Sequence, residues 1–197
     1  MLKRLLDLLV AVLLLPVLLP VMALEAIAIA LDSRGPVLFV QERIGLHGAP
    51  FRMYKFRTMI PPEHSLDASG KLRPDAERVT RLGNLLRRTS LDELPQLFNI
   101  LKGDMSLVGP RPTLRYQVER YDAFQRRRLE VRPGITGLAQ VRGRNSLTWE
   151  EKIRHDVEYV ETHSFLGDLR ILLATVRVVL RRGDTEFVKD DHISKVD

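Results

Sequence analysis

The stretch Leu8-Leu-Val-Ala-Val-Leu-Leu-Leu-Pro16-Val-Leu-Leu-Pro20-Val-Met-Ala-Leu24 contains no charged residue, and Asp7 and Glu25 bound it. A straight helix needs about 20 apolar residues to cross a bilayer, so the run is slightly short. Pro16 and Pro20 each remove a backbone donor and obstruct the preceding turn, so a helix through them should kink. Because a kinked apolar helix can enter a membrane and return on the same side, the run predicts a membrane anchor.

The same residues also have the parts of a secretory signal. Lys3 and Arg4 precede the apolar run, and the small residues Ala26, Ala28 and Ala30 suit a cleavage site. These residues alone leave both interpretations open. The motifs further along the chain indicate nucleotide and phosphate chemistry, which belongs in the cytoplasm and favours a retained anchor.

Composition narrows the classes of function. A chain of 197 residues allows one cored domain beside the terminal segment. The absence of cysteine excludes disulfides, thiolate zinc sites and cysteine nucleophiles. The formal charge of +6 predicts attraction to polyanions, which include phosphorylated lipids, nucleotide sugars and nucleic acids. Aromatic residues make up only 6% and no recognition helix is apparent, so no nucleic-acid partner is predicted.

Beyond the apolar run, the pattern predicts a small α/β domain of the α+β type that is mostly helical. Residues 37–40 and 51–56 contain β-branched and aromatic side chains around a turn, which predicts a short β-hairpin. Residues 61–75 are rich in Pro, Asp, Ser and Gly and predict a surface loop. The predicted boundaries are residues 1–31 for the membrane helix kinked at Pro20, 32–182 for the folded domain and 183–197 for a polar tail.

Three later segments carry apolar residues at helical spacing, a pattern that marks a core more often than a cofactor pocket. They are Leu114, Val118, Tyr121 and Phe124; Trp149, Ile153, Val157 and Val160; and Leu169, Leu172, Leu173, Val176, Val179 and Leu180. In the last segment, Arg170, Arg177 and Arg181 are predicted to lie opposite the Leu and Val face. That arrangement suits a helix in a membrane interface and equally an ordinary surface helix.

The chemistry is concentrated between Arg87 and Arg111, where carboxylates lie beside several cations. Asp92 and Glu93 directly precede Leu94-Pro95, and proline favours the first helical position, so the pair is predicted at a helix N-terminus. The backbone donors at a helix N-terminus stabilise an ionised carboxylate and also bind phosphate. Asp92 and a diphosphate can occupy that site together if a divalent cation screens their repulsion. Ser90 and Glu93 alternatively have capping-box spacing. Proline inside the resulting helix would disrupt its bonding and argues against that alternative.

Two further segments predict phosphate binding. In Val108-Gly-Pro-Arg-Pro112, Pro110 and Pro112 fix the backbone around Arg111, whose planar guanidinium suits phosphate. The segment Arg132 to Arg144 contains three glycines and three arginines, which let backbone and cations approach a polyanion. The histidines show no metal-binding spacing and are interpreted as surface or structural; they are His47, His64, His155, His163 and His192.

Together, residues 90–112 (Ser-Leu-Asp-Glu-Leu-Pro-Gln through Val-Gly-Pro-Arg-Pro) and residues 132–140 (Arg-Pro-Gly-Ile-Thr-Gly-Leu-Ala-Gln) strongly resemble the small monotopic phosphoglycosyl transferases. The resemblance also includes residues 54–59, 143–145 and 149–150, and it extends less specifically from residue 3 to about residue 180. It implies a re-entrant helix on the cytoplasmic side of a bacterial inner membrane, followed by a catalytic domain seated at the interface. One departure is Leu19-Pro20, where the family often has Ser-Pro.

The resemblance also implies an enzymatic function. The family transfers a sugar 1-phosphate from a UDP-sugar to undecaprenyl phosphate, releasing UMP, and Asp92 occupies the position of its nucleophile. Glu93 is assigned deprotonation of the acceptor, and Mg²⁺ would bridge Asp92 and the diphosphate. The expected charge-neutralising and supporting residues are Arg111, Lys55, Arg87, Arg144, Pro110, Pro112 and Asp156. Membrane lipids are expected partners, a homodimer is left open, and the rival function is a basic membrane-tethered protein that binds anionic lipid without turnover.

Overall fold

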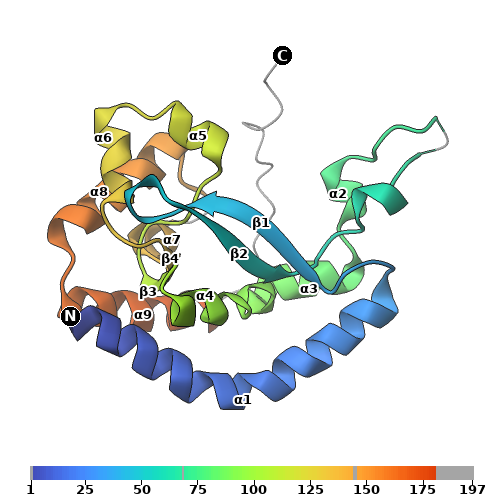
Figure 1. Ribbon diagram of the computed structural model, residues 1–197, viewed down its shortest axis with the longest axis horizontal. Coiled ribbons are helices and arrows are strands. Elements are labelled where there is room, and N and C mark those ends of the chain that lie inside the picture. Colours follow the sequence, from blue (N-terminus) through green and yellow to red (C-terminus); the bar gives the residue numbers. More distant parts are fainter. Residues whose placement is uncertain (1, 68, 144–145, 181–197) are drawn as a thin grey trace.

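The computed structural model describes residues 2–67, 69–143 and 146–180 (Figure 1). The helices and strands are α1 (Leu2–Asp32), β1 (Leu38–Ile44), β2 (Pro50–Phe56), α2 (Asp75–Arg78), α3 (Arg81–Thr89), α4 (Gln96–Lys102), β3 (Ser106–Val108), α5 (Arg115–Glu119), α6 (Ala123–Arg126), β4 (Gly134–Thr136), α7 (Leu138–Arg142), α8 (Trp149–Thr162) and α9 (Phe165–Leu180). The predicted, mostly helical fold class is confirmed. Arg144, Arg181, His192 and the tail 183–197 lie outside the described residues.

Helix α1 is continuous through both prolines, and Figure 1 shows it bent near its middle, with its two ends rising to the folded domain. By length and composition it is apolar enough to cross a membrane. Its outer side chains are strongly exposed, with Val17 and Leu24 each 68% accessible. The face toward the domain carries Asp7, Ala11, Met22, Glu25 and Ile29. The two carboxylates that bound the apolar run therefore both point inward.

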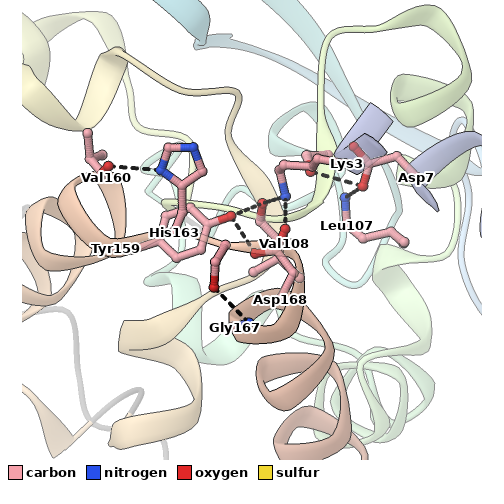
Figure 2. A network of polar contacts seen from close by, with 11 residues as sticks. Lys3, Asp7, Leu107, Val108, Tyr159, Val160, His163, Gly167 and Asp168 are labelled. Atoms are coloured by element: carbon pink, nitrogen blue, oxygen red, sulfur yellow. Dashed lines mark hydrogen bonds and ion pairs between the residues drawn. The ribbon is translucent and has the colours of Figure 1, made fainter. Parts of the chain in front are cut away.

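The N-terminal end of α1 is tied to the domain by a polar network (Figure 2). Lys3 Nζ lies 2.7 Å from Asp168 Oδ2 of α9 and also donates to the Val108 carbonyl at 2.9 Å. Tyr159 of α8 donates to the other Asp168 oxygen at 2.7 Å. One turn along α1, Asp7 Oδ1 accepts a 3.0 Å hydrogen bond from the Leu107 amide. These contacts attach the helix start directly to β3 and α9.

The C-terminal end of α1 is held by one buried arginine. Arg57, just after β2, donates from Nη2 to the carbonyl oxygens of Ser33 at 2.6 Å and Ile29 at 3.3 Å. Its Nη1 donates to the Pro36 carbonyl at 2.6 Å. A guanidinium can satisfy several carbonyls at once because its donors are held in a fixed planar fork. Both ends of the apolar helix are thus bonded to the same domain.

The predicted β-hairpin is confirmed, although its first strand runs further than expected, to Ile44. Strands β1 and β2 pair antiparallel from Leu38 opposite Phe56 to Ile44 opposite Pro50. A second, parallel pair joins β3 to β4 and was not predicted. The parallel pair is tightly packed, since a Cβ on Gly134 would lie 2.1 Å from the Gly109 amide nitrogen. Short strands that pair across a long connection give no periodic signal in the sequence.

The helical stripes are confirmed unevenly. The α8 stripe buries Ile153, Val157 and Val160 as expected. The first stripe is divided between two short helices, α5 and α6. Val118 of α5 is buried, as is Tyr121 between the helices, whereas Phe124 of α6 is 46% exposed.

In α9 the predicted separation of arginines from the Leu and Val face is wrong. Leu173 is 64% and Val176 is 56% exposed, while Arg170 and Arg177 are exposed as well. The physical reason is helix geometry, because Leu173 lies three residues after Arg170 and four before Arg177 and so shares their side. The outer face of α9 therefore mixes arginine with large apolar side chains.

Candidate active site

Asp92 and Glu93 lie in a 3₁₀ turn, Leu91–Glu93, between α3 and α4. Ser90 ends α3 in the left-handed region at φ 59° and redirects the chain into this turn. The carboxylates precede a helix as expected, although α4 begins at Gln96, one residue later than the predicted Pro95. The alternative capping box is absent, since Ser90 makes no side-chain cap and Glu93 bonds elsewhere. The side chain of Glu93 is therefore available to bond with neighbouring cations.

Glu93 is fully engaged by two cations. Its Oε1 accepts from Lys55 Nζ at 2.7 Å and from Arg111 Nη2 at 2.7 Å, and the residue is only 8% exposed. Burial alone raises the pKa of Glu93, but Arg111 and Lys55 outweigh it and hold that pKa at about 2. Glu93 is therefore an anion over the whole physiological pH range.

Asp92 differs from Glu93 in its hydrogen bonding and in the direction in which its pKa is shifted. It is also 8% exposed, but within the described part of the chain its carboxylate accepts no hydrogen bond. Burial, followed by repulsion from Glu93, raises the pKa of Asp92 to about 6, against the attraction of Lys55, Arg111 and Arg87. The site thus holds one carboxylate paired with cations and one that accepts no hydrogen bond from the described residues.

The predicted cations Lys55, Arg87 and Arg111 are brought together from separate elements. Lys55 comes from β2, and burial, with the charge of Arg111, lowers its pKa. Arg87 comes from α3 and donates from Nε to Thr58 Oγ1 at 2.8 Å, and its charge interacts with that of Asp92. Arg111 follows β3, and 49% of its side chain is exposed, so an incoming anion can reach it. Three cations around two carboxylates leave a net positive site.

The turn that carries Arg111 is rigid, as its prolines predicted. Pro110 and Pro112 are buried while Arg111 between them is exposed. The Gly109 amide donates to the Thr136 carbonyl at 2.9 Å, and a Cβ on Gly109 would lie 2.3 Å from the carbonyl oxygen of Arg132, just before β4. Only glycine fits this approach of two backbones. The β3–β4 pair therefore fixes the direction in which Arg111 projects.

Asp156 acts on this turn through a second residue. It is 2% exposed and forms a buried ion pair with Arg128. Arg128 also donates to the Arg111 carbonyl at 2.9 Å and to the Tyr121 hydroxyl at 2.6 Å. Asp156 thus supports the Arg111 backbone and does not itself join the carboxylate pair.

Sequence reasoning missed two polar residues at this site. Arg43 of β1 donates from Nη2 to Gln41 at 2.7 Å, while its buried Nε has no partner in the described chain. Burial, followed by the charge of Arg111, lowers the pKa of Arg43 to about 10. Glu25 of α1 is 8% exposed, and its charge interacts with that of Asp92. Neither residue belongs to a local motif, so only the packing of distant elements reveals them.

The described residues provide no cluster of three or more His, Asp or Glu side chains placed to hold a metal ion. The available donors are carboxylate oxygens, which are the ligands that Mg²⁺ prefers, and Mg²⁺ commonly uses one or two of them together with substrate phosphates. The free Asp92 carboxylate fits that requirement. A divalent cation held here would need a bound phosphate to complete its coordination.

The family model described as bacterial sugar transferase matches residues 1–182. The chain is 51% identical over 179 residues to the sugar transferase EpsL of Bacillus subtilis, covering 91% of this chain and 87% of that protein. It is 47% identical over 186 residues to the UDP-glucose:undecaprenyl-phosphate glucose-1-phosphate transferase of Caulobacter vibrioides, covering 90% and 69%. It is 42% identical over 185 residues to the UDP-N-acetylgalactosamine-undecaprenyl-phosphate N-acetylgalactosaminephosphotransferase of Aeromonas hydrophila, covering 90% and 43%.

Proposed function

Because this chain belongs to the bacterial sugar transferase family, we propose that it transfers a sugar 1-phosphate from a UDP-sugar to undecaprenyl phosphate, the first membrane step of a glycan. The observation that carries the proposal is the contrast between Asp92, which has no ion-pair partner among the described residues, and Glu93, which two cations bind. That arrangement holds an anion beside an available nucleophile. The relatives named above differ in the sugar that their names state, so the sugar is left open.

In the proposed first step, an Asp92 oxygen attacks the sugar-linked phosphorus of the donor. The bond from that phosphorus to the bridging oxygen breaks, UMP leaves with the electron pair, and a phosphosugar ester of Asp92 remains. In the second step, a phosphate oxygen of undecaprenyl phosphate attacks the same phosphorus. The Asp92 carboxylate leaves unchanged, and the product is a polyprenyl diphosphate sugar.

The cations have two tasks in this scheme. Arg111, Lys55 and Arg87 would neutralise the phosphates, so that an anionic nucleophile can approach an anionic donor. A donor phosphate competes with Glu93 for Arg111 and Lys55, because one oxygen of Glu93 takes both cations in the free protein. Loss of those partners raises the proton affinity of Glu93, which would let it serve the acceptor in the second step.

We further propose that Asp92 contributes a ligand to Mg²⁺. When bound, the ion would supply positive charge to the donor diphosphate and so lower its repulsion of the carboxylate. Arg111 and Lys55 act on the phosphates from the side of Glu93, while Asp92 keeps an oxygen for attack. This division requires that Asp92 remain free of protein hydrogen bonds, as it is in the described chain.

We propose that α1 is re-entrant and that the domain faces the cytoplasm of a bacterial cell, at the inner membrane. Lys3, at the start of the bent helix, bonds to the domain, and Arg57 of the same domain bonds to the end of the helix. These contacts support entry and exit on the same side of the membrane. The exposed Leu173 and Val176 beside arginines of α9 suit an interfacial helix, whose apolar side chains enter lipid while arginines meet headgroups.

The test is release of UMP from a panel of UDP-sugars by protein in lipid nanodiscs, with Mg²⁺, with and without undecaprenyl phosphate. Sustained release that needs the lipid acceptor is expected for one or a few sugars, and a single equivalent is expected without acceptor. Asp92→Asn should abolish both phases, while Glu42→Gln, which removes an exposed carboxylate of β1, should preserve them. Salt-sensitive binding of anionic lipid with no turnover of any donor would favour the rival binding protein.

A further inference from the structure

The side chain of Glu25, in α1, is buried without a hydrogen-bond partner among the described residues. The residue is 8% exposed, and neither Oε1 nor Oε2 has a hydrogen-bond partner among the described residues. Burial without a partner is costly for an ionisable oxygen, so such groups are rare in folded proteins. The orphan carboxylate lies on α1 beyond both prolines, where its neighbours Leu24 and Ile27 face outward. A bound ligand or ion would satisfy the two Glu25 oxygens, which the described residues leave without a hydrogen bond.

Asp7 shows what a structural carboxylate of the same helix looks like. Asp7 is 2% exposed, and its Oδ1 accepts from both the Ser106 hydroxyl and the Leu107 amide at 3.0 Å. Helix α1 thus buries two acidic residues against the domain, and among the described residues Asp7 has hydrogen-bond partners whereas Glu25 has none. Glu25 is not explained by a need to anchor the helix, because Asp7 and Arg57 already do so.

The helix face that carries Glu25 packs near the turn that carries Asp92. Glu25 shares its helix face with Met22 and Ile29, which pack in one cluster with Leu91 and Leu94, the residues that flank the carboxylate pair. The turn that carries Asp92 therefore packs against the face of α1 that bears Glu25, and the negative charge of Asp92 also acts on Glu25.

The cations of the site are already bonded to residues other than Glu25 and Asp92. Lys55 and Arg111 bond to Glu93, and Arg87 bonds to Thr58. Among the described residues, no hydrogen bond or ion pair joins a cation to Glu25 or to Asp92. Two hard, mutually repelling oxygen donors without a shared cation make an incomplete divalent-cation site.

We propose that Glu25 supplies, together with Asp92, a carboxylate ligand to the divalent cation of this site, so that the membrane helix completes the metal centre. The inference rests on the proposed function, which places a cation at Asp92. Mg²⁺ bound by two carboxylates retains room for donor phosphate oxygens. The arrangement would couple the seating of α1 to catalysis, because a shift of the helix would withdraw one ligand.

The test is a Mn²⁺ titration followed by electron paramagnetic resonance, on full-length protein in nanodiscs with saturating uridine diphosphate. Glu25→Gln should weaken Mn²⁺ binding at least tenfold, and Asp92→Asn should do the same. Glu25→Asp keeps the charge on a shorter side chain and should fall between wild type and Glu25→Gln. Asp32→Asn removes an exposed acidic residue of the same helix and should bind Mn²⁺ as wild type does.

Thermal unfolding provides a readout that does not depend on turnover. In EDTA, Glu25→Gln should unfold at the same or a higher temperature than wild type, because it removes an unpartnered buried charge. Added Mg²⁺ should raise the melting temperature of wild type and Asp32→Asn, and the rise should vanish in Glu25→Gln. If Glu25→Gln melts at a lower temperature than wild type in EDTA, Glu25 has a structural role and the proposal is overturned.

The outcomes separate this inference from the proposed function. Unchanged Mn²⁺ affinity in Glu25→Gln, with wild type still releasing UMP, would remove Glu25 from the metal site and leave the transferase standing. Unchanged affinity with a raised KM for the donor would instead assign Glu25 to a sugar hydroxyl, which also overturns the cation ligand. Weakened binding in both Glu25→Gln and Asp92→Asn, without UMP release by wild type, would support the metal site and contradict the transferase.

Discussion

Lys55 Nζ lies 2.7 Å from Oε1 of Glu93, and both side chains are mostly buried. The same oxygen accepts from Arg111, so one carboxylate keeps two cations in place next to Asp92. Glu93 is therefore expected to organise the phosphate-binding cations before the donor arrives. Its adjacent position in the chain does not make it equivalent to Asp92.

Glu93→Gln is expected to change both stability and the pH dependence of the first step. Breaking a buried ion pair by removing one partner costs about 3–5 kcal/mol, because the other charge stays buried. Removal of the Glu93 charge also removes a repulsion that raises the pKa of Asp92 to about 6. The pH midpoint for single-turnover UMP release should therefore move to lower pH than in wild type. A midpoint that stays in place would contradict the electrostatic coupling of the pair.

Asp92→Asn should stabilise the metal-free protein in a pH-dependent way. The pKa of Asp92 rises from 3.8 to about 6 on folding, so the folded chain holds this proton more tightly than the unfolded chain. Ionised Asp92 therefore costs stability that grows as the pH rises through this range and is fully present above it. At about 1.4 kcal/mol per pKa unit, the variant should gain roughly 2–3 kcal/mol at pH 7.5.

Denaturant unfolding in EDTA at pH 7.5 and 4.5 measures this gain for Asp92→Asn, which should shrink at the lower pH. A stability gain of the same size at both pH values would show that Asp92 does not titrate in that interval. UMP release should be abolished at both, because the amide cannot form the phosphosugar ester.

Asp156→Asn tests whether the Arg128 pair positions the arginine turn. Both side chains of the pair are less than 5% exposed, so the variant should lose about 3–5 kcal/mol of unfolding free energy. The KM for the donor should rise, since Arg128 also holds the Arg111 carbonyl.

The matched control is Glu161→Gln, which breaks the half-exposed pair with Arg127 and should cost no more than about 1 kcal/mol. It should leave the KM unchanged. Equal effects of Asp156→Asn and Glu161→Gln would argue that burial of the Asp156 pair contributes nothing to the turn.

The topology of α1 can be read by thiol labelling, because the chain has no cysteine of its own. A Leu2→Cys variant places one thiol at the helix start, and Ser69→Cys places one in an exposed loop of the domain. A re-entrant helix predicts that a membrane-impermeant maleimide labels both thiols in inverted vesicles and neither in intact spheroplasts. Labelling of Leu2→Cys alone from outside the spheroplast would establish a spanning helix.

The local sequence determined the parts of this protein that depend on neighbouring residues. The apolar run with Pro16 and Pro20 predicted a bent helix, the β-branched and aromatic segments predicted the hairpin, and Pro110 with Pro112 predicted an exposed arginine on a rigid turn. The contiguous motif around Asp92 also carried the family resemblance. Each of these follows from backbone chemistry or from a pattern within a few residues.

Only the tertiary structure decided which charged side chains meet and how their pKa values are shifted. Lys55 and Arg111 are 56 positions apart and meet at one oxygen of Glu93, and this meeting separates the pKa of Glu93 from that of Asp92. The inward direction of Glu25 and the β3–β4 pair likewise depend on how distant segments pack. Burial and pairwise charge are properties of three-dimensional neighbours, which a linear sequence does not list, and they decide which of the two carboxylates is paired with cations.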